Sequence, residues 1–352
     1  MEFRPEFTAF TLAGMPHKDE DRACRVMLCN FPQVPTVPWL TMSTRMYLEG
    51  MPCLNIDRER KVISFDLSPA RESELVEFYD RYFLQDLDYF ATSPKYNAVL
   101  YRLAEILGEM QSPGVAFVHF QIPGPYTFGL QIKDESGAPC FYNNDMRDLV
   151  VNQLAMKAKW YMREIRRVFS GAPVLIQLGE PALGVYGSAT GTGSWEEIQG
   201  ALDKVMEAVR SDGGMSSVHC CANFDWSLLM KTSADVIHFD AYHYGETMSL
   251  YTEALRRFLG RGGTIAWGIV PTTGGTTGKA DVEDEDPRKL IKRLEGYMEL
   301  VVERGVDKEV LARSSWISSS CETATLSTEL AERVFELTSQ VSRQMKEQHL
   351  FP

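Results

Sequence analysis

Short apolar runs alternate with longer helical stretches through most of this chain. The apolar run at residues 174–178, for example, is followed by a helical stretch at 195–211 and then by another apolar run from residue 216. Such an alternation predicts parallel strands joined by crossover helices. Six of these runs are clear, at residues 115–121, 174–178, 216–221, 235–240, 263–269 and 314–319.

Two further units in the first third of the chain could raise the number to eight, starting with a strand at residues 7–12. Eight units within 352 residues favour an α/β fold of the closed (β/α)8 TIM-barrel type over an open sheet. We therefore expect one barrel domain spanning residues 1–352. Residues 32–70 and 271–286 are predicted as insertions on it, and the Gly- and Thr-rich part of the second insertion as a lid.

Polar side chains of unusual kinds stand where the predicted strands end. In a (β/α)8 barrel, the carboxyl ends of the strands form one face, and active sites are built on that face. The residues at these ends are Gln121, Glu180, His219, Cys221, Asp240 and Cys321.

The stretch SSVHCCANFDWSLLMKTSADVIHFD, residues 216–240, holds the most specific of these side chains. His219 and Cys221 are two positions apart at a strand end, so both side chains can point to the same side. Imidazole nitrogen and thiolate sulfur are ligands that zinc takes in tetrahedral geometry. A His-Cys pair alone is more often core packing than a metal site, and Cys321 is the best distant candidate for a further ligand. Cys220 is expected to point into the barrel wall.

The composition excludes several classes of partner. Apolar residues make up 44% of the chain, but no run of about eighteen of them appears, so we expect no membrane-spanning helix. A net charge of −12 disfavours nucleic acid as a partner. Seven unevenly spaced cysteines predict reduced thiols rather than a disulfide framework, and the N-terminus lacks the pattern of a signal peptide. These features predict a cytoplasmic enzyme.

Several short motifs together resemble a known family. GMPHKD near the start, GEPAL in mid-chain, HCC, ADVIHFD and a late SCETATL follow one another in an order that resembles the catalytic half of cobalamin-independent methionine synthase. The chain is also similar to methylcobalamin-dependent thiol methyltransferases and, more distantly, to uroporphyrinogen decarboxylase. The resemblance implies a zinc ion that holds the thiol of homocysteine, or of another thiol cofactor, while the barrel presents that thiol to a methyl donor.

The resemblance also implies which residues form the site. Zinc ligands fall on His219, Cys221 and Cys321, and the carboxylate ligand falls on Asp240, with Glu246 in the following loop as its rival. A zinc-bound thiol is deprotonated, and the thiolate is the nucleophile. The residues expected to contact the substrate are His17, Gln121 and Glu180.

Three departures from the family's pattern bear on the substrate and the donor. Gly14 stands where the family has a serine, and Gly179 stands where it has a carboxylate that would hold the substrate amine. Gly268 stands where folate-using relatives have a histidine that can serve as general acid. A methyl group on cobalt needs no such acid. We therefore expect methylcobalamin or a methylated corrinoid protein as donor rather than methyltetrahydrofolate.

The leading expectation is a zinc-dependent methyltransferase that acts on a small-molecule thiol, with homocysteine as acceptor and methionine as product. One alternative is a methylcobalamin:thiol-cofactor methyltransferase with a coenzyme M-like acceptor. Another is a metal-free enzyme like uroporphyrinogen decarboxylase, which would want an arginine-rich pocket, and the predicted strand ends show little arginine. A non-enzymatic alternative is a corrinoid-binding or scaffold protein.

Overall fold

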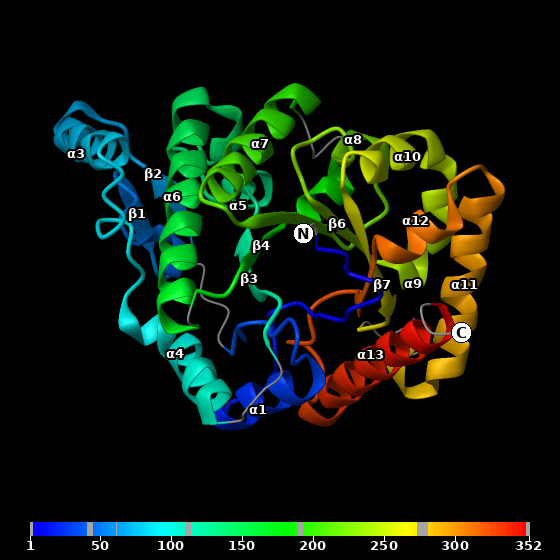
Figure 1. The fold of residues 1–352 in the computed structure, drawn as a ribbon. Coiled ribbons are helices and arrows are strands. Elements are labelled where there is room, and N and C mark those ends of the chain that lie inside the picture. The colour runs from blue at the N-terminus through cyan, green and yellow to red at the C-terminus, as the bar shows by residue number, and fades with distance from the viewer. Residues whose placement is uncertain are drawn as a thin grey trace.

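A curled sheet of six parallel strands forms the centre of the molecule, and helices surround it (Figure 1). The computed structural model describes residues 3–40, 45–60, 62–109, 114–169, 171–188, 193–272 and 281–349. The strands lie side by side in chain order: β3 (Val118–Pro123), β4 (Val174–Gly179), β5 (Met215–Cys220), β6 (Val236–Phe239), β7 (Thr264–Val270) and β8 (Ser315–Ser319).

Helices connect these strands as predicted, and several begin where the local sequence offers a cap. The Asn143 side chain accepts from two backbone N–H groups at the start of α6, and Ser194 forms a capping box with Glu197 at the start of α7. The connecting helices are α5 (Pro125–Gln131), α6 (Asn144–Val168), α7 (Trp195–Ser211), α8 (Trp226–Leu229), α9 (Ala241–Tyr244), α10 (Thr252–Gly260), α11 (Pro287–Glu303) and α12 (Lys308–Arg313), and α13 (Thr328–His349) follows the last strand. Short 3-10 turns are η2 (Cys140–Tyr142), η3 (Pro181–Val185), η4 (Gly245–Tyr251) and η5 (Asp281–Asp284).

The first third of the chain adds peripheral elements. Its helices are α1 (Glu20–Asn30), α2 (Arg45–Leu48), α3 (Glu72–Phe83) and α4 (Pro94–Glu109), with the 3-10 turn η1 (Pro69–Arg71) before α3. An antiparallel hairpin of β1 (Leu54–Asp57) and β2 (Val62–Phe65) lies with α3 at one edge of the molecule, outside the ring of helices (Figure 1). The predicted insertion therefore contains a separate two-stranded sheet.

Two irregular extended segments occupy the places of the first two barrel strands. Near residue 9 the chain runs parallel to β8, where the Phe10 N–H donates to the Ile317 carbonyl over 3.1 Å. Near residue 36 it runs parallel to β3, where the Val37 N–H donates to the His119 carbonyl over 3.0 Å. Each contact is an isolated bridge rather than a ladder. The fold is thus TIM-barrel-like, with six regular strands in place of the eight expected, and residues 34–39 belong to the ring rather than to an insertion.

Side chains inside the ring form layers, because alternate residues of each strand face inward. On β4, for instance, Leu175, Gln177 and Gly179 rise from the amino end to the carboxyl end of the strand. The lowest layer is an apolar cluster of Phe10, Val34, Phe117, Leu175, Val236, Ala266 and Trp316. Polar side chains lie above this cluster, toward the carboxyl ends of the strands, where the site residues were expected.

Two of the connections between strands contain short elements. The connection from β5 to β6 holds the single turn of α8, and in the connection from β6 to β7 the turns α9 and η4 precede α10. Most of the expected lid, residues 273–280, lies outside the described residues. None of the described helices is long and apolar enough to cross a membrane.

Candidate metal centre

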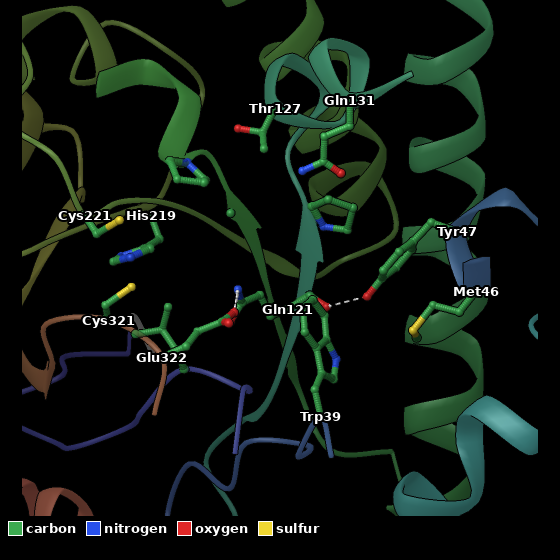
Figure 2. Close-up of a pocket in the computed structure, with 14 residues that line it drawn as sticks. Trp39, Met46, Tyr47, Gln121, Thr127, Gln131, His219, Cys221, Cys321 and Glu322 are labelled. Carbon is green, nitrogen blue, oxygen red and sulfur yellow. Dashed lines mark hydrogen bonds between the residues drawn. The ribbon is translucent and has the colours of Figure 1, made fainter. Parts of the chain in front are cut away.

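His219, Cys221 and Cys321 come together at the carboxyl ends of β5 and β8. His219 is the penultimate residue of β5, Cys221 follows that strand directly, and Cys321 lies two residues beyond β8. Their ligand atoms all lie within 4.8 Å of one another, and the three side chains face the same space (Figure 2). Cys220 points the other way into the hydrophobic core and is fully buried. The two-residue spacing on the strand therefore did predict the geometry of this pair.

The imidazole of His219 is buried without a hydrogen-bond partner. The residue is 3% exposed, and neither ring nitrogen has a partner among the described residues. Burial, with the nearby His238 ring as a smaller cause, lowers the pKa of His219 well below its usual value. A neutral imidazole has a lone pair to offer a metal, and an unpartnered buried polar group costs free energy unless something binds it.

The thiols of Cys221 and Cys321 change each other's pKa. A hydrogen bond from Cys321 lowers the pKa of Cys221, and the same interaction together with burial raises the pKa of Cys321. Cys221 is therefore the thiol of the pair that loses its proton more readily.

A zinc ion fits this donor set. Two thiolates bound to a tetrahedral zinc at about 2.3 Å lie about 3.8 Å apart, so sulfurs within 4.8 Å need only a small contraction. One nitrogen and two sulfurs also leave a fourth position, which catalytic zinc sites keep for substrate or water. The unpartnered nitrogens of His219 point to the same conclusion.

The structure does not bring the predicted carboxylate ligand into this cluster. Asp240 caps α9, and its carboxylate lies 2.7 Å from Nδ1 of His243 and accepts from the His243 backbone N–H. It is close enough to Cys221 for its charge to oppose, in small part, the lowering of the Cys221 pKa by Cys321. The rival Glu246 is an exposed residue of η4. Asp240 as a metal ligand therefore stays a prediction, and a ligand role would require it to leave His243.

A cavity of about 200 Å³ opens beside the cluster. The three cluster residues lie at one end of it, while Trp39, Met46 and Tyr47 stand at the other (Figure 2). Gln121 and Glu322 lie between the two ends (Figure 2). The described lining residues are Leu12, Trp39, Met46, Tyr47, Gln121, Pro123, Thr127, Gln131, Gly179, Pro181, His219, Cys221, Cys321 and Glu322.

Gln121, one of the three predicted substrate contacts, does line the cavity. Its Oε1 accepts from the Ala13 N–H over 3.1 Å, and its Nε2 donates to Oε1 of Glu322 over 2.8 Å. Burial raises the pKa of Glu322, and the bond from Gln121 opposes that rise in part. Sequence reasoning missed Glu322, although it directly follows Cys321 in the SCETATL motif.

The other two predicted substrate contacts are not among the described lining residues. Glu180 is fully buried, and its two oxygens accept from the backbone N–H groups of Tyr126 and Thr127 at the start of α5. His17 is 2% exposed, and its Nε2 lies 3.1 Å from a carboxylate oxygen of Glu332. In this structure both side chains hold segments of the face in place.

Two further histidines lie deeper in the ring and are fully partnered. His119 pairs through Nδ1 with Thr36, and His238 pairs through Nε2 with the Ser319 carbonyl. The remaining ring nitrogens face one amide, that of Gln177, at 3.1 and 3.4 Å. Burial lowers the pKa of both rings to about 3, so both are neutral. Both histidines therefore belong to the polar part of the core rather than to the candidate metal centre.

Comparisons with known proteins report on the fold. No family model and no curated protein matches this sequence. Among solved structures, the chain is similar to a B12-independent methionine synthase from a Shewanella species, in complex with selenomethionine, with 14% identity and a TM-score of 0.59. It is also similar to a candidate vitamin-B12-independent methionine synthase from Listeria monocytogenes, with 13% identity and a TM-score of 0.57. Each match covers 98% of this chain and 99% of the other. At such identities the likeness shows a shared fold over the whole chain.

Proposed function

We propose that this protein is a zinc-dependent methyltransferase of the methionine synthase type, which methylates a small-molecule thiol, with homocysteine as the first candidate acceptor. The observation that carries the proposal is the cluster of His219, Cys221 and Cys321 beside a cavity on the carboxyl-end face. The full-length likeness to structures described as B12-independent methionine synthases supports it. One of those structures contains selenomethionine, the selenium analogue of the product that methylated homocysteine would give.

The residues at the cluster and those along the cavity would have different roles. His219, Cys221 and Cys321 would hold the ion, which when bound would lower the pKa of the substrate thiol and keep it as a thiolate. Apolar side chains such as Leu12, Trp39 and Met46 line the cavity, so fewer water molecules would surround a thiol bound there. A thiolate with little water around it is a stronger nucleophile toward a methyl group.

The charge of the cavity favours an acceptor whose head group carries no net charge. None of the described lining residues is a lysine or an arginine. Homocysteine carries a carboxylate, but its own protonated amine offsets that charge. A coenzyme M-like thiol carries a sulfonate and a porphyrinogen carries several carboxylates, with no protonated amine to offset them, so each would enter with a net negative charge and no cationic partner among these residues. The metal-binding cluster itself has no role in the decarboxylase alternative.

The methyl donor stays a prediction. A Cβ atom at Gly268 would lie 2.5 Å from the Phe239 carbonyl oxygen and 2.9 Å from that of Ser319, so the backbone leaves no space for a histidine there. This favours a donor that needs no acid at this position, as a methyl-corrinoid does. The descriptions of both neighbours as B12-independent weigh against a corrinoid. Both donors therefore belong in the test.

The test starts with the metal. Purified protein is expected to hold about one zinc per chain, and Cys321→Ser is expected to lower zinc affinity by at least about 100-fold, since even outer-shell changes cost 10–100-fold. Cys220→Ser is the matched control, because this neighbouring thiol faces the core. Metal analysis after dialysis against a chelator gives the comparison, and circular dichroism shows whether each variant is folded. Full zinc occupancy in Cys321→Ser would contradict the site.

Activity comes second. The zinc-loaded protein is incubated with homocysteine and either methylcobalamin or methyltetrahydrofolate, and methionine is measured. Methionine formed with methylcobalamin, and little with the folate, is the expected result. Comparable rates with the folate alone would overturn the predicted donor but not the proposed transfer to a thiol. No methionine with either donor, from protein that holds zinc, would argue against homocysteine as the acceptor.

A further inference from the structure

We propose that Glu322 determines substrate specificity, selecting thiols that carry a protonated amine over thiols with an anionic head group. This inference rests on the proposed function, because it assumes that the substrate sulfur lies at the cluster of His219, Cys221 and Cys321. The part of the substrate that Glu322 would recognise is its amine.

One oxygen of Glu322 is held and the other is available. Oε1 accepts from Nε2 of Gln121 over 2.8 Å, whereas Oε2 accepts no hydrogen bond from any described residue. Gln121 is itself fixed, because its Oε1 accepts from the Ala13 backbone and Tyr47 donates to its backbone carbonyl over 3.1 Å. The carboxylate is therefore positioned through Oε1, the residue lines the cavity (Figure 2), and Oε2 keeps its capacity to accept a hydrogen bond.

The chain makes space for this carboxylate at Gly14. A Cβ atom at Gly14 would lie 2.7 Å from Oε2 and 2.9 Å from Cδ of Glu322. The two segments are also tied together, because the Gly14 carbonyl accepts from both the backbone N–H and the hydroxyl of Thr323, over 3.0 and 2.9 Å. Any larger residue at position 14 would thus press on the carboxylate while its backbone stayed in place.

Glu322 is the only carboxylate, and the only Asp, Glu, Lys or Arg, among the described residues that line the cavity. A carboxylate in an apolar cavity is costly unless a cation or several donors pair with it. With a divalent ion bound, the two cluster thiolates balance the charge of that ion, so a substrate thiolate adds a further negative charge. A protonated amine on the substrate would offset this charge and pair with Oε2, whereas a head group of net negative charge near Glu322 would be repelled.

The position of Glu322 suits a small aminothiol. It follows Cys321 directly in the chain, and both side chains line the same cavity (Figure 2). We expect a molecule whose sulfur and nitrogen are separated by two or three carbons to reach the cluster and the carboxylate together. Gly179 also leaves space for this arrangement. A Cβ atom at position 179 would lie 3.3 Å from Nε2 of Gln121, the atom that donates to Glu322.

The test uses three thiols of equal length that differ only in head-group charge: 2-aminoethanethiol, 2-mercaptoethanol and 2-mercaptoethanesulfonate. Their binding to the zinc-loaded protein is measured by isothermal titration calorimetry, in the absence of any methyl donor. Each variant is compared with the unmodified protein thiol by thiol, so that differences in the acidity of the thiols cancel. Zinc content is measured on every sample.

Glu322→Gln is expected to lower the affinity for 2-aminoethanethiol by about tenfold or more, because a charge-assisted hydrogen bond is lost. The affinity for 2-mercaptoethanol is expected to stay nearly unchanged. The sulfonate is expected to bind more tightly to this variant. Gly14→Ala keeps the charge of Glu322 but displaces its carboxylate, so this variant is expected to bind the aminothiol several-fold more weakly. Glu329→Gln removes the same charge from an exposed position on α13 and serves as the control.

If Glu322→Gln retains zinc and its affinities for all three thiols change by the same factor, the inference is overturned and the proposed function stands. An aminothiol that binds the variant as tightly as the unmodified protein would do the same. A protein that takes up no zinc would overturn the proposed function, and this inference with it.

Discussion

Glu180 and Glu322 are both carboxylates at the ends of barrel strands, and each occupies space that a glycine leaves open. A Cβ atom at Gly124 would lie 2.2 Å from Cδ of Glu180, just as one at Gly14 would lie 2.7 Å from Oε2 of Glu322. Burial raises the pKa of both carboxyl groups. The two residues are therefore alike in residue type, in their place after a strand and in the glycine beside them.

The difference lies in what their oxygens contact. Glu180 is fully buried, and both of its oxygens accept from backbone N–H groups at the start of α5. Glu322 lines the cavity, with one oxygen bound by Gln121 and the other accepting no hydrogen bond from any described residue. A carboxylate whose acceptors are all used holds the fold together, while one with a free acceptor in a cavity can bind a ligand. The histidines follow the same rule, since His238 is fully partnered and His219 is not.

The largest expected change in unfolding free energy comes from placing a Cβ atom at Gly124 or Gly14, in the space that each glycine leaves open. Gly124 has φ −76 and ψ 154, which alanine adopts readily, so the cost of Gly124→Ala is purely steric. We expect this variant to lose about 3 kcal/mol of unfolding free energy, because Glu180 cannot move without giving up both N–H donors. Gly14→Ala should lose about 1 kcal/mol, because Glu322 can move into the cavity. Urea unfolding measures both, and equal losses would remove the distinction between the two carboxylates.

A smaller effect is expected from removing the charge while keeping the shape. Glu180→Gln places an amide NH2 against a backbone N–H of Tyr126 or Thr127, which should cost about 1–3 kcal/mol. Glu322→Gln should change unfolding free energy by less than about 0.5 kcal/mol, because no backbone group depends on it. Hydrogen exchange of the α5 amides gives a local measure: faster exchange in Glu180→Gln only is the expected pattern. Faster exchange in Glu322→Gln would mean that it, too, is structural.

A pH dependence of the free energy of unfolding sharpens the contrast further. Burial raises the pKa of Glu180 from 4.5 to about 7, despite the two N–H donors. Between these values the folded protein binds a proton that the unfolded chain lacks, so the stability contributed by Glu180 is present below pH 4.5 and is lost as the pH rises through about 7. Glu180→Gln should flatten this part of the stability profile. An unchanged slope in urea titrations across the interval would show that Glu180 is already ionised in the fold.

Features that depend on local spacing followed from the amino-acid sequence. Side chains two apart on a strand face the same way, so spacing alone paired His219 with Cys221 and assigned Cys220 to the core. The helix starts followed from local caps such as Asn143. The late strand end also identified Cys321, because parallel strands present their carboxyl ends on one face.

Features that depend on space between distant segments emerged only from the folded chain. Gly14 and Glu322 are more than 300 positions apart, and only their contact shows that a missing side chain at one admits the carboxylate of the other. The strand-end position of Glu180 predicted a place in the pocket, but the space beside Gly124 directs its side chain to the start of α5. A strand fixes the direction of its side chains by alternation. A loop residue just past a strand end has no such rule, so packing and available hydrogen-bond donors decide where its side chain points.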